Sequence, residues 1–422
     1  MLLRLKDHEH SAWIGMPMIG QKSVSVLLKV MRARRSSSNG DASATAVSRK
    51  NGVTSVKQRE LRFNDFEAVA RLRDVAGSSP DSLENWDRLW RNSPAVRFAK
   101  SPLPMGWVLE DDGKIVGYLA SIPLLYHFGD QPLLAAAASG FVVENAYKTF
   151  SKDLVAAFYG QPNIDLFLST TLPSLGRFAN AFQVETLPQQ NYSTVLFWVL
   201  DARHFADAVV WHLGVTGRLR TLGGMLGSLA LRADTMACRR RPRRASSKFQ
   251  ISEIPVSEIG DDFEALWRKK LAEKPRLLAD RNPAILRWHF TLPGSRKDTN
   301  VFRCDSQGRL VGYAILRRET DPPGLRRCNL GDILVEGDDR EIAASLVARG
   351  YQLALDYGCH TFEVLGYPEF VRQVFQQGKP YSRDYPACPY FFKASDSSLH
   401  GVLTNGDSWY ASPLDGDTTL MP

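Results

Sequence analysis

An internal repeat restricts the fold of this chain more than any other feature of its sequence. The stretch LEDDGKIVGYLASIP at 109–123 matches CDSQGRLVGYAILRR at 304–318, so that Val116 corresponds to Val311. In each copy a polar turn containing glycine separates two β-rich runs, and this pattern predicts a β-hairpin. A chain that repeats such a unit is expected to build the same small fold twice.

The two copies stay in register well beyond the hairpin. Trp90 corresponds to Trp288 before it, and the apolar run that ends at Glu144 corresponds to the run that ends at Glu336 after it. In both copies the glutamate is followed by a turn, a helix-like run, another strand-like run and a short helix-like run. The order helix, hairpin, strand, helix, strand, helix occurs twice, which predicts a duplicated α/β unit.

Composition places the boundaries of the two copies within the 422 residues. We expect residues 1–55 to be a disordered basic tail, because the stretch 32–52 is poor in apolar side chains and rich in Ser, Ala and Arg. The first copy is then expected over 56–192, a helical connection and basic linker over 193–250, and the second copy over 251–422.

The turn after the first copy's glutamate resembles that of a known superfamily. Residues 143–153 read VENAYKTFSKD. They are similar to the pyrophosphate turn of the GCN5-related N-acetyltransferase (GNAT) superfamily, roughly V-x-P-x-x-R-x-x-G-x-G/A. Val143 fits, and Lys148, Ser151 and Asp153 stand where the family has Arg or Gln, the first Gly and the second small residue. The resemblance covers about 57–190 and, more loosely, 251–395. It implies an α/β (α+β) fold of two tandem GNAT-like mixed sheets flanked by helices.

Elementary electrostatics suits this turn to an anion. The first amides of a helix lack intrahelical partners, the helix dipole adds partial positive charge, and Lys148 adds a cation. Alternatively, the same residues would form an ordinary helix start, with Ser151 as the N-cap and Asp153 in the first turn. From the resemblance we expect acyl-CoA contacts at the strand end and the turn: Phe141, Val142, Val143, Lys148, Thr149, Ser151, Lys152 and Leu154.

The corresponding turn of the second copy differs in charge. It reads Glu336-Gly337-Asp338-Asp339-Arg340. Three carboxylates facing a pyrophosphate would be unfavourable, so we expect that the second copy does not bind coenzyme A there and serves as a scaffold.

Acyl transfer to an amine requires that the amine lose its proton, and Glu144 at the strand end is the candidate base. Members of the superfamily often place a tyrosine general acid four residues before a Gly-Phe pair. The matching stretch GRFANAF has Arg177 at that position, so the usual acid is missing. Ser169, Thr170 and Thr171 add hydroxyl groups at the next strand end, where ligands collect in open α/β sheets.

The resemblance implies an acyltransferase that moves an acetyl or other acyl group from acyl-CoA to a small-molecule amine. Two alternatives stay open. The tandem layout also resembles Fem-type aminoacyl transferases, which use aminoacyl-tRNA. Alternatively, Asp153, the missing tyrosine and the acidic second turn favour a GNAT-like binding or scaffold protein without turnover. The sequence leaves the oligomeric state open.

The net charge of +8 is concentrated in two segments. Residues 1–60 hold eleven basic and four acidic residues, and 239–248 hold six basic residues, so the remainder is net acidic. No element interleaves aromatic with basic residues, which argues against specific nucleic-acid binding. The stretch 205–233 is expected to be helical with glycine breaks, and it either packs across the two copies or makes peripheral membrane contact beside the basic run.

The remaining features restrict location and metal content. The sequence has no uninterrupted apolar run of about 18 residues, so we predict no membrane span. The five cysteines are scattered and never spaced as CxxC, which favours a reducing, cytoplasmic compartment and argues against structural zinc. Asp407, Asp415 and Asp417 lack the following glutamate of a calcium loop, so we expect a turn-rich terminal segment and no metal.

Overall fold

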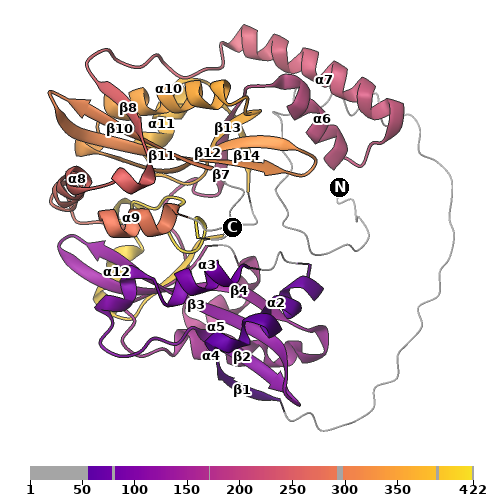
Figure 1. Ribbon diagram of the computed structural model, residues 1–422, viewed down its shortest axis with the longest axis vertical. Helices are drawn as coiled ribbons and strands as arrows, with labels where there is room; N and C mark the ends of the chain where they lie inside the picture. Colours follow the sequence, from indigo (N-terminus) through magenta and orange to yellow (C-terminus); the bar gives the residue numbers. More distant parts are fainter. Residues whose placement is uncertain (1–55, 78–80, 171, 292–297, 386–388, 421–422) are drawn as a thin grey trace.

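The computed structural model describes residues 56–77, 81–170, 172–291, 298–385 and 389–420 (Figure 1). The expected disordered tail, 1–55, and Thr171 lie outside the described residues. Two mixed sheets flanked by helices confirm the predicted fold class and the duplication. Val116 and Val311 lie at equivalent places, each in the second strand of its hairpin.

The first sheet has the order β1-β2-β3-β4-β5-β15-β6, with β9 paired to the far end of β3. Its strands are β1 (Lys57–Glu60), β2 (Gly106–Asp111), β3 (Lys114–Phe128), β4 (Gln131–Val143), β5 (Leu166–Ser169), β6 (Glu185–Thr186), β9 (Leu277–Ala279) and β15 (Phe391–Ala394). The helices of this half are α2 (Phe66–Val75), α3 (Leu83–Trp90), α4 (Ser151–Tyr159), α5 (Ala179–Phe182) and α12 (Ser397–Leu403).

The second sheet has the order β14-β7-β13-β12-β11-β10-β8. Its strands are β7 (Thr194–Val199), β8 (Gln250–Ile254), β10 (Asp298–Ser306), β11 (Arg309–Asp321), β12 (Leu325–Val335), β13 (Thr361–Val364) and β14 (Tyr381–Asp384). The helices of this half are α6 (Ala202–His212), α7 (Gly217–Cys238), α8 (Asp261–Leu271), α9 (Pro283–Phe290), α10 (Arg340–Asp356) and α11 (Glu369–Gln377).

The two halves exchange strands: β7 joins the second sheet, whereas β9 and β15 of the expected second copy join the first. β7 follows the first copy along the chain, yet it lies between β13 and β14 of the second sheet. β15 belongs to the stretch expected as the second copy, 251–422, yet it lies between β5 and β6 of the first sheet. The segment 193–250, expected to be a connection and linker, therefore begins with β7, the second strand from one edge of the second sheet. Neither sheet is built from one contiguous stretch of chain.

The hairpin turns confirm the repeat at the level of backbone conformation. Asp112 and Gly113 have φ of 48° and 74°, and Gln307 and Gly308 have φ of 52° and 74°. Two successive residues with positive φ match the right-handed twist of the flanking strands, and a glycine at the second position accepts that conformation without a Cβ clash.

The two sheets lie in separate halves of the molecule (Figure 1), and a continuous apolar cluster joins their inner faces. It contains Tyr118 and Ile122 from β3, together with Tyr313 and Ile315 from β11. Separate clusters fill the outer faces, where α4 covers the first sheet and α10 covers the second. Among the described helices, none is long and apolar enough to cross a membrane.

Candidate functional site

In the first half, β4 and β5 separate where the resemblance places the acyl donor. Their parallel pairing covers Ala135–Ala137 and Leu166–Leu168, and beyond Ala137 the described pairing of β4 is with β3 alone. Phe141, Val142 and Val143 lie on this extension and are half-buried. The free edge of β4 can therefore present backbone groups to a ligand, and the acyl-CoA contacts of these three residues stay a prediction.

The turn after β4 is wound more tightly than a phosphate loop. Residues Asn145–Phe150 form a 3-10 helix, η3, which runs directly into α4. Phe150 stands at the N-cap position, and the Ser151 amide donates to the Lys148 carbonyl. The expectation that Ser151 caps an ordinary helix is wrong, because η3 already supplies the preceding turn. The Ser151 hydroxyl is buried without a hydrogen-bond partner among the described residues.

The cations of this turn remain free of carboxylates. Lys148, Thr149 and Lys152 are exposed, and neither lysine forms an ion pair with a described residue. Leu154 differs from the other expected contacts, because its side chain is fully buried in the cluster under α4. The end of η3 and the start of α4 therefore each present to solvent a lysine that has no ion-pair partner among the described residues.

Glu144, the candidate base, binds the hairpin of its own copy. Its carboxylate lies 2.7 Å from the Lys114 ammonium. The neighbouring Tyr147 hydroxyl donates to Asp111 at 2.7 Å, and this bond raises the pKa of Tyr147. The second copy repeats the hairpin pair, because Glu336 binds Arg309 there.

The position of the missing tyrosine acid holds a cation beside β4. Arg177 lies in the 3-10 helix η4 (Pro173–Phe178), with its guanidinium 4.7 Å from the Phe178 ring centre and 5.9 Å from that of Phe141. Of the expected strand-end hydroxyls, Ser169 is buried without a partner among the described residues. Thr170 donates to Asp417 of the C-terminal segment at 2.9 Å.

The equivalent turn of the second half carries its own anions. Asp338 accepts from the buried Lys270 at 2.7 Å and from Arg276 at 2.9 Å. Burial opposes ionisation of Asp338, but these two cations outweigh it and hold its pKa well below the usual value. Asp339 accepts from the first amides of α10, those of Glu341 and Ile342. Carboxylates of the chain thus fill the positions that a pyrophosphate would need.

The separation between β12 and β13 is also filled. The parallel pairing ends at Asn329, and β12 continues to Val335. The Tyr367 hydroxyl donates to the Leu330 carbonyl at 3.1 Å, and the Tyr410 hydroxyl donates to the Ile333 carbonyl at 2.7 Å. Both tyrosines are fully buried. Side chains of the second half and the C-terminal segment therefore occupy the space beside this part of β12.

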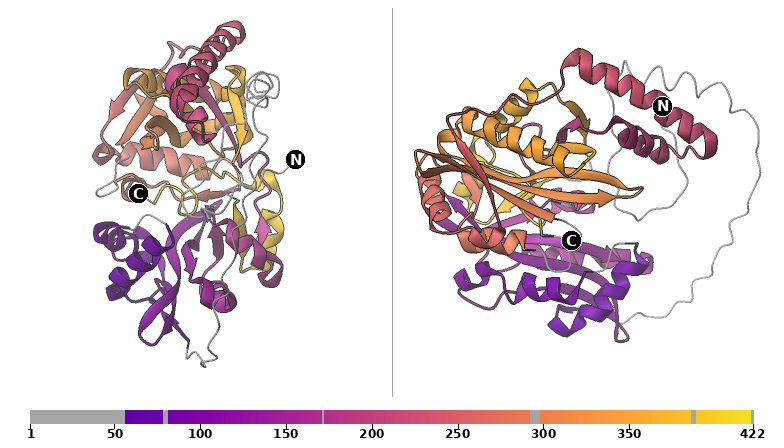
Figure 2. Two further views of the ribbon diagram at one scale, coloured as in Figure 1. Left: turned by 90° about the vertical axis from the view of Figure 1, so that its right-hand side faces the viewer. Right: turned by 45° about the horizontal axis from the view of Figure 1, so that its top comes forward.

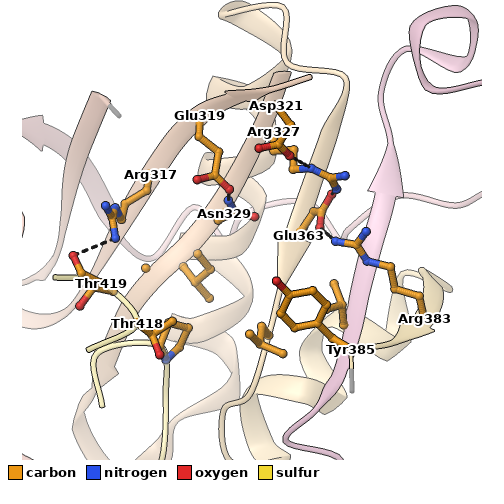
Figure 3. Close-up of a pocket in the computed structure, with 15 residues that line it drawn as sticks. Arg317, Glu319, Asp321, Arg327, Asn329, Glu363, Arg383, Tyr385, Thr418 and Thr419 are labelled. Atoms are coloured by element: carbon orange, nitrogen blue, oxygen red, sulfur yellow. Dashed lines mark hydrogen bonds and ion pairs between the residues drawn. The ribbon is translucent and has the colours of Figure 1, made fainter. Parts of the chain in front are cut away.

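A polar pocket of about 260 Å³ lies on the inner face of the second sheet (Figure 3). Arg327 binds Asp321 and Glu363, and Arg383 binds Glu363 at 2.6 Å. Sequence reasoning missed this pocket. Its signal was the alternation of charged residues at strand spacing, which points them to one face. The polar lining comes from four strands and the C-terminal segment: Arg317, Glu319, Asp321, Arg327, Asn329, Glu363, Arg383, Tyr385, Thr418 and Thr419.

Burial and neighbouring charges oppose each other in the electrostatics of the pocket wall. It raises the pKa of Glu363, but the charges of Arg327 and Arg383 outweigh it and lower that pKa to about 2. Burial lowers the pKa of Arg317, which Glu319 partly offsets. Arg317 Nη1 donates to the Thr419 carbonyl at 2.9 Å, whereas its Nε and Nη2 are buried without partners among the described residues.

The C-terminal segment connects this pocket to the first half. Thr418 lines the pocket, and its hydroxyl lies 3.2 Å from that of Thr170 at the end of β5. Asp415, in the same segment, accepts from the Ser412 amide and the Tyr390 hydroxyl. Its burial raises its pKa to about 6. The expected turn-rich terminal segment is thus a buried strap between the two sheets.

One group of described side chains has its ligand atoms close enough to hold a metal, namely Asp201, His204 and His360. The environment of His360 opposes a cation. Its two ring nitrogens lie 3.1 Å from the Arg326 amide and 3.3 Å from the Arg326 guanidinium. Burial and the nearby charges of His204 and Arg326 lower the pKa of His360 to about 4.

Comparison with known proteins identifies the fold. No family model and no curated protein matches the sequence. A solved GCN5-related N-acetyltransferase from Anabaena variabilis is 10% identical, with 81% of this chain and 73% of that chain covered and a TM-score of 0.52. One from Kribbella flavida is 8% identical, with 82% and 72% covered and a TM-score of 0.50. A probable N-acyltransferase from Enterococcus faecalis is 10% identical, with 81% and 73% covered and a TM-score of 0.50. The chain therefore has the GNAT fold in tandem.

Proposed function

We propose that this protein transfers an acyl group, acetyl or another, from acyl-CoA to an amine acceptor. The contrast between the two turns carries the proposal. In the second turn, Asp338 accepts from Lys270, and Asp339 accepts from the first amides of α10. In the first turn, Lys148 and Lys152 have no anionic partner among the described residues. The N-acetyltransferase names of structures with this fold support the reaction class.

The donor is assigned to the first half. Lys148 and Lys152 neutralise the coenzyme A pyrophosphate beside the start of α4, with Thr149 and Ser151 close by. The free edge of β4 at Phe141–Val143 lies along the thioester. Backbone amides at such an edge stabilise the oxyanion that forms when the thioester carbonyl is attacked.

The transfer forms a carbon–nitrogen bond and breaks the carbon–sulfur bond. A free alkyl amine has a pKa of about 10.4, so it must lose a proton before it attacks. Glu144 at the end of β4 is assigned as the base, and it receives this proton once Lys114 releases it. After the attack the nitrogen gives its second proton to solvent, and the leaving thiolate takes a proton from water, because the position of the usual tyrosine acid holds Arg177.

The acceptor is assigned to the polar pocket of the second half. Thr418 of the pocket contacts Thr170 at the end of β5, so the C-terminal segment places the pocket next to the donor half. The unpartnered donors of Arg317 suit an acceptor that carries a carboxylate or another oxyanion besides its amine. The volume of about 260 Å³ suits a small molecule.

One observation favours a binding protein without turnover. On the inner face of the first sheet, Ile122, Leu124 and Leu168 belong to the continuous apolar cluster and are buried. These apolar side chains close the inner face of the first sheet to a polar acceptor, which favours binding without acyl transfer.

Titration calorimetry with acetyl-CoA tests the donor site. Lys148→Glu should weaken binding by about 1–3 kcal/mol, since it replaces a charge-assisted contact by repulsion. Arg340→Glu reverses an exposed charge at the equivalent point of the second half and should leave affinity unchanged. Asp153→Gly should leave affinity intact or raise it.

The outcomes separate the alternatives. Unchanged affinity in Lys148→Glu, with binding in the parent, would place the donor site elsewhere. Acyl-CoA binding without acylation of any amine in a panel that includes amino acids would favour the binding protein. Acyl transfer that requires charged tRNA would favour the Fem-type reaction.

A further inference from the structure

Along α7 three small residues and Leu231 are buried, whereas the other large apolar residues are exposed. Gly223, Gly224 and Ser228 of α7 are buried. A Cβ at Gly224 would lie 2.4 Å from the Asp207 carboxylate of α6, so the two helices approach too closely for a larger side chain. An ordinary surface helix buries its large apolar residues instead.

The outward side of α7 carries an exposed apolar stripe. Its members recur at intervals of three, four and seven residues, which places them on one helix face. Leu219 is 69% exposed, Leu229 61% and Met236 79%. Trp211 and Leu213 are also exposed, beside the turn between the two helices. The stripe consists of Leu219, Leu222, Leu226, Leu229 and Met236, with Met225 alongside.

Both ends of the stripe are basic. Arg220 and Arg240 are paired with Asp207 and Asp234. The other arginines of α7 and of the segment that follows it form no ion pair with the described residues, and they are exposed: Arg218, Arg232, Arg239, Arg241, Arg243 and Arg244. The last four line a hollow of about 800 Å³ between this segment and α10.

Figures 1 and 2 place α7 at the outer edge of the molecule, where a planar surface can reach it. We propose that the stripe and its arginines bind the protein to an anionic lipid surface, with α7 in the plane of the interface. An apolar face flanked by unpaired arginines is complementary to acyl chains beneath anionic headgroups. A second copy of the chain is a poorer occupant, because arginines at both ends of the stripe repel their counterparts in either helix orientation.

Co-sedimentation of the full-length protein with vesicles tests this proposal. Phosphatidylcholine vesicles with 30% phosphatidylserine should pellet the protein at low salt, and pure phosphatidylcholine vesicles should not. The triple variant Leu222→Ser, Leu226→Ser, Leu229→Ser should lower the partition coefficient at least tenfold. Since these side chains are exposed, the fold should survive, and circular dichroism checks it. A matched control removes three exposed apolar side chains elsewhere: Val75→Ser, Leu83→Ser and Phe98→Ser.

Charge neutralisation forms the second arm. Arg241→Gln, Arg243→Gln and Arg244→Gln together should weaken binding to the anionic vesicles roughly a hundredfold, at about fivefold for each arginine near the surface. Three outcomes would overturn the proposal. The first is no pelleting with anionic vesicles at low salt. The second is equal pelleting of the serine triple variant and the parent. The third is a stable dimer in light scattering that the serine triple variant abolishes, since a second copy would then cover the stripe.

Discussion

The inner faces of the two sheets share a backbone register but have opposite chemistry. Pairing of β3 with β4 and of β11 with β12 places Ile122 opposite Ala137, and Arg317 opposite Asn329. At matching points the first half has apolar side chains and the second half has charged or polar ones. The first set is Ile122, Leu124, Tyr126, Ala135, Ala137 and Leu168; the second is Arg317, Glu319, Asp321, Arg327, Asn329 and Glu363.

This contrast shows how one scaffold supports two kinds of interior. Apolar side chains at these positions pack without regard to direction, so the first face is closed. Buried charges require partners in fixed directions, and the network of Arg327, Glu363 and Arg383 leaves a pocket between its members. The two halves have the same backbone fold, and their inner-face side chains determine which of the two sheets has a polar pocket.

Moving a charge to the matching point of the first half should give the largest effect. In Leu168→Glu the new carboxylate takes the position of Glu363, but Ala135 stands where the second half has Arg327. We expect a loss of about 3–5 kcal/mol in the free energy of unfolding, the cost of an unpaired buried charge, measured by urea denaturation. Leu168→Met is the control and should cost less than about 1.5 kcal/mol. A loss below 1 kcal/mol in Leu168→Glu would mean that the first face is not closed.

The second largest effect should be a loss of folding stability when acid protonates Glu363 on the charged face of the second sheet. The pKa of Glu363 is lowered to about 2, so the carboxylate contributes stability above the unfolded value near 4.5 and loses it as the pH falls towards 2. The loss is on the order of 3 kcal/mol, at about 1.4 kcal/mol for each pKa unit. Denaturation series from pH 6 to pH 2 on the parent and on Glu363→Gln should converge in this window. Curves that stay parallel below pH 4.5 would contradict the pairing.

Removing the exposed hairpin ion pair should have the smallest effect on the free energy of unfolding, and the effect should be equal in both halves. Lys114 binds Glu144, and Arg309 binds Glu336, on equivalent and exposed hairpins. Lys114→Ala and Arg309→Ala should each change the free energy of unfolding by less than about 1 kcal/mol, because exposed pairs are screened by water and salt. A much larger loss for Lys114→Ala alone would show that the two hairpins are not equivalent.

The repeat, the hairpins and the order of elements could be predicted from sequence, because they depend on local patterns such as Gly113 and Gly308 in matching turns. The exchange of β7 and β15 could not. The sequence of an apolar strand such as 194–199 does not indicate which sheet the strand will join. Each sheet has one position between two of its strands that such a strand can fill.

The candidate site was predictable to a similar extent. Lys148 and the acidic turn at Asp338 could be identified from the sequence alone. The buried partners of Asp338 could not, because Lys270 and Arg276 lie more than sixty residues away from it. The filling of the β12 edge by Tyr410 depends equally on tertiary contact. The pocket needed the register of four strands, which a single sequence does not contain.

The strand exchange has a consequence for biosynthesis. On the ribosome, the first sheet lacks its strand between β5 and β6 until residues 391–394 emerge, about two hundred residues after β6 is made. At roughly 5–20 residues per second this interval lasts on the order of 10–40 s. During it, β5 exposes an unpaired edge to the cell, and the nascent chain depends on the rest of its own translation to close it.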